Sequence, residues 1–209
     1  MRRFLLVLPL LATVPIIAYA ASHSEPKAPA PAVDVSKISS GNYVVEKHHT
    51  QILWSVSHFG FNDYFGLFGQ MTGTLSLDKA DPSKSKVMIN IPINEIATSR
   101  GDLSKHMMSA DFFDVAKYPT ATFVSTSVEP MPGNKAKITG NLTMLGMTKP
   151  VVLDAQLSGG GGNPMSKKET IGFHAKTTID RTQWGMTKFA PNIGASVNLK
   201  ISAAFEKAA

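Results

Sequence analysis

From residue 42 onward, apolar and polar residues alternate along most of the chain with a period of two. The clearest case is residues 135–144, where every second residue is Ala, Ile, Gly, Leu or Met. The same pattern recurs within residues 43–46, 52–58, 67–77, 87–93, 121–128, 151–157, 171–179 and 197–205. Successive side chains of a strand point to opposite faces, so this period indicates strands with one apolar and one wet face.

An antiparallel sheet of this size must cover its apolar face, and few helical patterns are available to do so. It therefore closes as a barrel or folds into a sandwich. Two features favour the barrel. In a long strand predicted for residues 66–77, Gly69 and Gly73 share a face, as expected where a sheet bends sharply at a barrel corner. The one credible helix, within residues 102–113, falls between two strands. We predict an all-β, antiparallel, up-and-down barrel of about eight strands, with this short helix capping one end.

The N-terminal part predicts export. Residues 1–20 open with two arginines, continue through an apolar run and end in Ala-Tyr-Ala, which is typical of a cleavable secretory signal. Two prolines interrupt the run, and it is shorter than the ~20 apolar residues of a spanning helix, so a membrane anchor is less favoured. Residues 21–41 hold three prolines and few large apolar side chains, which predicts a flexible tether. Residues 42–207 then form one domain.

Charge and cysteine content exclude several classes of function. The chain has 21 Lys and Arg against 15 Asp and Glu, and its positive residues never form a run of four. A nucleic-acid site is therefore not indicated, whereas weak attraction to an anionic lipid surface stays open. The chain has no cysteine, which excludes disulfides, thiol catalysis and thiolate metal sites.

The inward face of the predicted barrel supplies the candidate ligand contacts. Its large residues are Trp54, Val56, Met71, Leu75, Ile89, Ile91, Phe123, Ile138, Leu142, Phe173 and Leu199. The adjacent Phe112 and Phe113 cannot share one face of a strand or helix, so burying both requires two apolar surfaces, as in a lid. Trp184 is a further candidate for the rim or lid. The same residues would also serve as a solid core.

Two polar residues are candidates for a ligand head group. His58 has the inward phase of Trp54 and Val56, so its imidazole needs a partner, either a head group or a loop carbonyl. Arg181 begins an Arg-x-x-Trp-Gly turn, and its guanidinium suits a phosphate or carboxylate. The alternative for Arg181 is a contact within the protein that organises this turn.

A metal or haem site is a second hypothesis. It rests on His48, His49, His58, His106 and His174, together with Met107 and Met108. No His-x-x-x-His or Glu-x-x-His pair occurs, and adjacent His48 and His49 would point to opposite faces of a strand. We therefore predict no metal and no cofactor.

An enzyme acting on a hydrophobic substrate is a third hypothesis. His106 would be the base, with Asp102, Asp111 or Asp114 as its partner. No nucleophile elbow, phosphate loop or glycosidase pair is recognisable, and Asp-Phe-Phe-Asp reads more simply as a cap and turn. We therefore predict no catalysis.

Five segments in order resemble the motifs of the YceI-like family of lipid- and polyisoprenoid-binding proteins. The most specific is the aromatic stretch at 104–123, and the others are His-Thr at 49–50, His-Phe-Gly at 58–60 followed by 65–73, Gly-Asn-Leu-Thr-Met-Leu-Gly-Met-Thr-Lys-Pro at 140–150, and Arg-Thr-Gln-Trp-Gly-Met at 181–186. Together they span roughly residues 42 to 206. One departure is Ser104, which stands where the family usually has Asp, two residues before His106.

The resemblance implies a periplasmic, lipocalin-like barrel whose bore holds a long isoprenoid, a quinone or another lipid. Residues 104–114, including His106, would then line or cap one end of the bore. Burial of ten methylene groups at ~0.8 kcal/mol each is worth about 8 kcal/mol before association costs, which favours a long chain. Exposed Phe59, Phe61 and Phe65 would serve a homodimer, a transient contact with a membrane surface, or the mouth of the bore.

Overall fold

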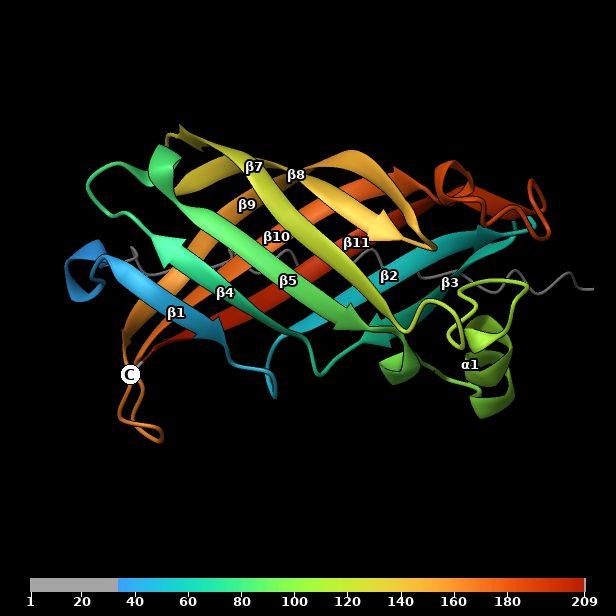
Figure 1. Cartoon of the computed structure of the whole chain (residues 1–209), viewed down its shortest axis with the longest axis horizontal. Coiled ribbons are helices and arrows are strands. Elements are labelled where there is room, and N and C mark those ends of the chain that lie inside the picture. The colour runs from blue at the N-terminus through green and yellow to red at the C-terminus, as the bar shows by residue number, and fades with distance from the viewer. Residues whose placement is uncertain (1–33, 209) are drawn as a thin grey trace, which may run out of the picture. The chain divides into compact units, whose positions relative to one another are not determined.

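The computed structural model describes residues 34–208; the predicted signal sequence and most of the predicted tether lie outside the described residues. The described part is a barrel with one α-helix (Figure 1). Its strands are β1 (Gly41–Val45), β2 (Gln51–His58), β3 (Asn62–Phe68), β4 (Thr72–Leu77), β5 (Lys86–Pro92), β6 (Ala97–Thr98), β7 (Thr120–Met131), β8 (Lys135–Met144), β9 (Met147–Gly162), β10 (Glu169–Asp180) and β11 (Ile193–Lys207). The helix is α1 (Gly101–Met108), and the 3₁₀ turns are η1 (Val35–Lys37), η2 (Pro82–Lys84), η3 (Ile93–Glu95) and η4 (Arg181–Trp184).

Eight antiparallel strands close the barrel. Their order is β1-β4-β5-β7-β8-β9-β10-β11, and β1 pairs with β11 to complete the ring. β2 pairs with residues 193–202 of β11 and β1 with residues 205–207, so the two strands follow one another along β11. β3 and β6 extend the sheet beyond β2, on the side where α1 lies (Figure 1). The predicted up-and-down barrel of about eight strands with a short helix at one end is confirmed.

The long strand predicted for residues 66–77 is interrupted at the expected bend. β3 ends at Phe68 and β4 begins at Thr72. Gly73 has a φ of 154°, and a Cβ at this position would lie 2.1 Å from the Met88 carbonyl oxygen. Only glycine allows β4 to approach β5 this closely while the chain turns, which explains the bend.

The interior of the barrel differs between its two ends. At the end away from α1, which we call the closed end, Ile38, Tyr43, Leu75, Ile171 and Phe205 form a compact core. Ile38 follows η1, within the segment assigned to the tether, and covers Gly160. Toward α1, a second core surrounds a cavity. Among the described residues, no helix combines the length and apolar character needed to cross a membrane.

A hydrogen-bond network around Glu169 fastens the closed end. The Tyr43 hydroxyl lies 2.5 Å from one carboxylate oxygen of Glu169, and the Ser39 backbone N–H and hydroxyl each donate to the carboxylate over 2.7 Å. Lys207 donates to the Ser40 carbonyl oxygen. The network therefore joins the start of β1 to β10 and to the end of β11, where the ring of strands closes.

This network makes the stability of the barrel sensitive to acid. Burial raises the pKa of Glu169, but the hydrogen bonds from Tyr43 and Ser39 outweigh it and lower the pKa below its ordinary value of 4.5. The unfolded chain therefore takes up this proton first, and stability is lost as pH falls below about 4.5. Glu169→Gln should flatten this part of the pH dependence in urea unfolding experiments. An unchanged acid dependence would contradict the assignment.

Candidate binding cavity

An apolar cavity of about 570 Å³ occupies the half of the barrel nearer α1. This volume lies within the usual range of small-molecule sites, about 300–1,000 Å³. Strand residues form most of the wall, because the inward positions of each strand alternate with outward ones. Those on the wall include Ile52, Trp54, Val56, Phe68, Ile91, Ala121, Leu142, Met144, Ile179, Val197 and Leu199.

The helix and the turn after it form a second part of the apolar wall. Ser104 on α1 accepts a hydrogen bond from the Thr98 backbone N–H over 3.0 Å, which ties the helix to β6. After the helix, the Phe113 N–H donates to the Met107 carbonyl oxygen. The Phe113 ring then packs edge-on against Phe68, with 5.7 Å between centroids. Leu103, Met107, Phe112 and Phe113 thereby face the cavity.

Partly exposed residues define the mouth of the cavity. They are His58, Asn62, Arg100, His106 and Phe189, which line the cavity and also reach solvent. Because the closed-end core fills the other half of the barrel, this mouth is the way in for a ligand. Exposed polar groups are thus gathered at the entrance, while the interior is mostly apolar apart from the buried Arg181.

The structure places the predicted site residues in three groups. Ten line the cavity: Trp54, Val56, His58, Ile91, His106, Phe112, Phe113, Leu142, Arg181 and Leu199. Five belong to the core around it: Met71, Ile89, Phe123, Ile138 and Trp184. Leu75 and Phe173 lie in the closed-end core. The alternating period identifies the inward face of a strand, but it does not indicate at which level the barrel is hollow.

Several other residues that line the cavity were not predicted as site residues. Ile52, Met144, Ile179 and Val197 occupy inward positions of the alternating pattern, so the sequence did carry a signal for them. Tyr64 and Phe68 share a face of β3, but the neighbouring Phe65 and Leu67 blur the alternation. Met186 and Phe189 come from the segment between η4 and β11, where no period exists, and tertiary contacts alone place them. Ile193 is the first residue of β11 and pairs with His58, but a register shift separates it from the alternation that begins at Val197.

Arg181 organises that segment. Its side chain is 4% exposed, and its guanidinium donates to the carbonyl oxygens of Gly194, Met186, Lys188 and Ile193 over 2.6–3.1 Å. Burial lowers the pKa of Arg181, while the charge of Asp180 opposes this effect. Of its two predicted roles, the geometry favours the contact that organises the turn, because four of the five N–H groups already have backbone acceptors.

His106 has a carboxylate partner at the mouth. Its Nε2 lies 3.0 Å from Asp111, which also accepts from Lys188 over 3.2 Å. The hydrogen bonds from His106 and then Lys188 lower the pKa of Asp111. Of the three predicted carboxylate partners, Asp111 is the one in contact, whereas Asp102 pairs with Arg100. Although Ser104 replaces the family's usual Asp, a carboxylate does face this histidine, from the turn after α1.

The histidines of the metal hypothesis are not gathered. Within residues 34–208, no group of three His, Cys, Asp or Glu side chains is placed to hold a metal ion. His48 and His49 do not lie on a strand, so that expectation is wrong. The Glu46 carboxylate accepts hydrogen bonds from both backbone N–H groups and folds the segment into a turn between β1 and β2.

Trp54 depends on a glycine on the neighbouring strand. Its indole is 5% exposed and lies over Gly66, and its Nε1 is buried with no acceptor in the described part of the chain. A Cβ on Gly66 would come 2.2 Å from the indole ring and 2.8 Å from the Ala97 carbonyl oxygen. The position of the Trp54 ring on the cavity wall therefore requires glycine at residue 66.

Gly66→Ala is expected to destabilise the barrel by about 1–3 kcal/mol, the usual cost of overpacking a core. Urea unfolding measures this change. Gly69→Ala is the matched control, because a Cβ there meets nothing within 4 Å. Equal unfolding midpoints for the two variants would show that the Trp54 ring can move aside without loss of stability.

Comparisons with known proteins agree with this architecture. The YceI-like domain model matches residues 43–205. A UPF0312 protein of Pseudomonas putida is 38% identical over 149 residues, covering 70% of this chain and 77% of the relative. Protein YceI of Salmonella arizonae is 37% identical over 165 residues, covering 78% of this chain and 85% of the relative.

Solved structures of other proteins share this fold. The Campylobacter jejuni YCEI protein is 27% identical, with a TM-score of 0.66, and the match covers 73% of this chain and 90% of that one. A polyisoprenoid binding domain from Saccharophagus degradans shares the fold with a TM-score of 0.58 and 13% identity, over 81% of this chain and all of that one. With the family model covering nearly the whole barrel and relatives above 35% identity, this chain belongs to the YceI-like domain family.

Proposed function

We propose that this protein binds a long-chain isoprenoid, a quinone or a related lipid in the cavity, and shields or carries it without chemical change. The observation that carries the proposal is the cavity itself, which is large, apolar on its walls and open at one end. The similarity in fold to a polyisoprenoid binding domain supports the same class of ligand.

The distribution of polar groups suggests how the lipid lies. The hydrocarbon chain would occupy the apolar wall between Trp54 and Leu199, because its removal from water supplies the binding energy. The head group would stay at the mouth near His58, Asn62 and Arg100, which remain in contact with water. A head group placed deeper would lose its hydration where the wall offers few polar groups.

The proposed location is the periplasm, reached through the signal predicted at residues 1–20. The N-terminal sequence pattern supports export. A protein that shields a water-insoluble lipid is useful where that lipid has to cross an aqueous compartment. Cell fractionation tests the location, and recovery of the protein in the cytoplasm would contradict it.

Native mass spectrometry tests the binding function. The protein is purified after export, without detergent, and its mass is compared before and after extraction with organic solvent. A co-purifying isoprenoid or quinone that extraction releases would support the proposal and identify the ligand. A folded protein that carries no lipid, and gains none on incubation with isoprenoids or quinones, would refute it.

A further inference from the structure

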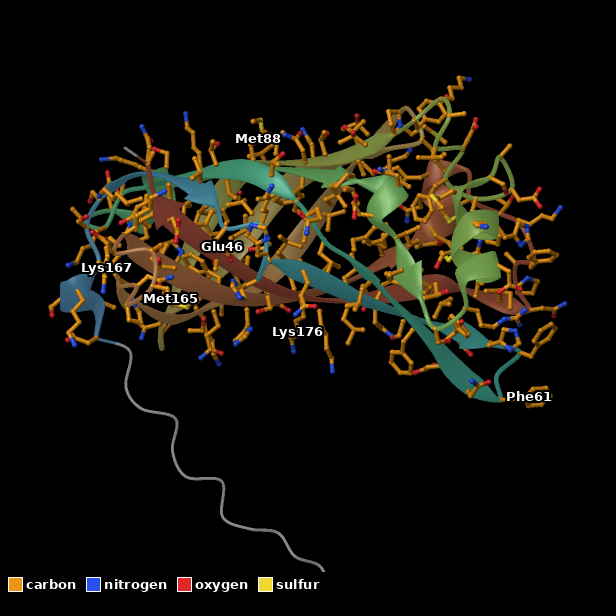
Figure 2. All side chains as sticks on the ribbon, turned by 90° about the horizontal axis from the view of Figure 1, so that it is seen from below. Glu46, Phe61, Met88, Met165, Lys167 and Lys176 are labelled. Atoms are coloured by element: carbon orange, nitrogen blue, oxygen red, sulfur yellow. The ribbon has the colours of Figure 1, made fainter. Side chains whose placement is uncertain are left out.

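Three exposed phenylalanines, Phe59, Phe61 and Phe189, lie on two loops beside the mouth, and we call them the aromatic rim. Phe61 is 88% exposed and projects near the tip of the β2–β3 hairpin (Figure 2). Phe59 and Phe189 are each about half exposed. The Phe59 N–H donates to the Asn192 carbonyl oxygen over 2.7 Å, so the two loops are joined. The rim is thus one surface.

Two rim residues are held in an unfavourable backbone conformation. Phe59 has a φ of 55° and Phe189 a φ of 61°, in the left-handed region that bulky residues rarely adopt. Each ring is only about half buried in return. Backbone strain that packing does not repay is typical of residues retained for a function.

The rim is continuous with the cavity. Phe189 is a rim residue and also lines the cavity, and its ring lies 6.2 Å from Phe112 on the cavity wall. On the other loop, Phe59 packs edge-on against His58 at the mouth, with 4.7 Å between centroids. A hydrocarbon chain could therefore pass from the rim into the cavity while remaining against aromatic side chains.

The charges around the mouth are of both signs, and exposed Asp63 and Lys105 add one of each. Arg100 forms an ion pair with Asp102, and Lys188 forms one with Asp111. This arrangement does not attract a partner of one charge sign, unlike a basic cluster. The surface therefore suits a partner with an apolar interior and a polar outer layer. A lipid bilayer has this chemistry, and phenylalanine inserts readily at its interface.

We propose that the aromatic rim inserts into the surface of a lipid bilayer and holds the mouth of the cavity against it. The inference rests on the proposed function, because an isoprenoid stored in a bilayer has to reach the cavity without exposing its chain to water. Each exposed methylene would oppose that step, at ~0.8 kcal/mol each. Docking at the mouth removes the aqueous step.

Co-sedimentation with vesicles of phosphatidylcholine alone tests docking, because these vesicles carry no net charge. Phe61→Ser should weaken binding about tenfold, the expected loss for one inserted phenylalanine. Phe59→Asn should weaken it similarly without loss of stability, because Asn-Gly suits two consecutive left-handed residues better than Phe-Gly. Met165→Ser is the matched control: Met165 is 90% exposed at the opposite end of the barrel (Figure 2), and its replacement should change nothing.

Three results would overturn docking. The first is wild-type protein that does not sediment with the vesicles. The second is binding that requires anionic lipid, disappears in high salt and is unaffected by Phe61→Ser, which would indicate general attraction to the basic chain. The third is a wild-type dimer, seen by analytical ultracentrifugation, that Phe61→Ser dissociates while vesicle binding is unchanged, which would assign the rim to a second copy.

A parallel uptake assay separates docking from ligand binding. A quinone with a long isoprenoid tail is supplied either in vesicles or diluted from ethanol. Docking predicts that Phe61→Ser slows uptake from vesicles about tenfold and leaves uptake from ethanol unchanged. Equal uptake by variant and wild type from vesicles would overturn docking while preserving the proposed function. If the wild type takes up neither this quinone nor a long-chain isoprenoid from either source, the proposed function fails, and the sedimentation assay still decides whether the rim binds bilayers.

Discussion

Replacing Arg181 with methionine is expected to lower the free energy of unfolding by about 3–5 kcal/mol, the usual cost of breaking a buried charged contact. The variant leaves four backbone carbonyl oxygens without their donor, two in the irregular segment after η4 and two at the start of β11. Urea unfolding measures the loss as a shift in midpoint at constant slope.

Arg181→Lys distinguishes geometry from charge. An ammonium group offers three donors at one point and cannot span carbonyl oxygens from four residues, so most of the loss should remain. Arg100→Met is the control, because Arg100 is exposed and its ion pair with Asp102 should contribute less than about 1 kcal/mol. A lysine variant as stable as the wild type would show that charge alone matters at residue 181.

The strands were predictable because each one carries its own local signal. Alternation in β8 and the inward phase of Trp54 and Leu199 follow from the pleat of a strand, whatever its neighbours are. Such features depend on short stretches of sequence. A sheet with one apolar face and one helix predicted either a barrel or a sandwich, and Gly69, Gly73 and the position of the helix favoured the barrel.

The cavity was only partly predictable because hollowness is a property of the assembled barrel. Leu75 and Leu142 have the same inward phase, yet Leu75 packs in the closed-end core and Leu142 faces the cavity. The difference arises from what lies across the barrel at each level. Phe173 and Phe205 fill the closed end, where their rings meet edge-on with 6.0 Å between centroids.

The segment after η4 was the least predictable part of the site. It brings Met186 and Phe189 to the cavity without any regular pattern of its own. Its conformation depends on one buried guanidinium, whose partners lie 5 to 13 residues further along the chain. The sequence indicated that Arg181 could organise this turn, but the acceptors are backbone atoms, which carry no sequence signal. The stability and the shape of the cavity therefore depend on the same residue.

Phe113→Asp is expected to weaken lipid retention at least about a hundredfold while the sheet remains folded. Phe113 is 8% exposed and lines the cavity, so a carboxylate there would have to lose its hydration or admit water beside the bound chain. The residue lies in the turn after α1, outside the strands, so the ladder of strand hydrogen bonds stays intact. Native mass spectrometry measures retention, and far-UV circular dichroism reports on the sheet.

Two controls separate loss of the site from loss of the fold. Phe113→Leu keeps an apolar side chain on the wall and should retain lipid, even though the edge-on contact with Phe68 is lost. Val152→Asp adds the same charge at an exposed position on β9 and should also retain it. Wild-type retention in a folded Phe113→Asp variant would show that the lipid does not contact this wall. Loss of lipid in Phe113→Asp alone would instead mean that the turn after α1 forms part of the binding surface, because the two controls share either its position or its charge.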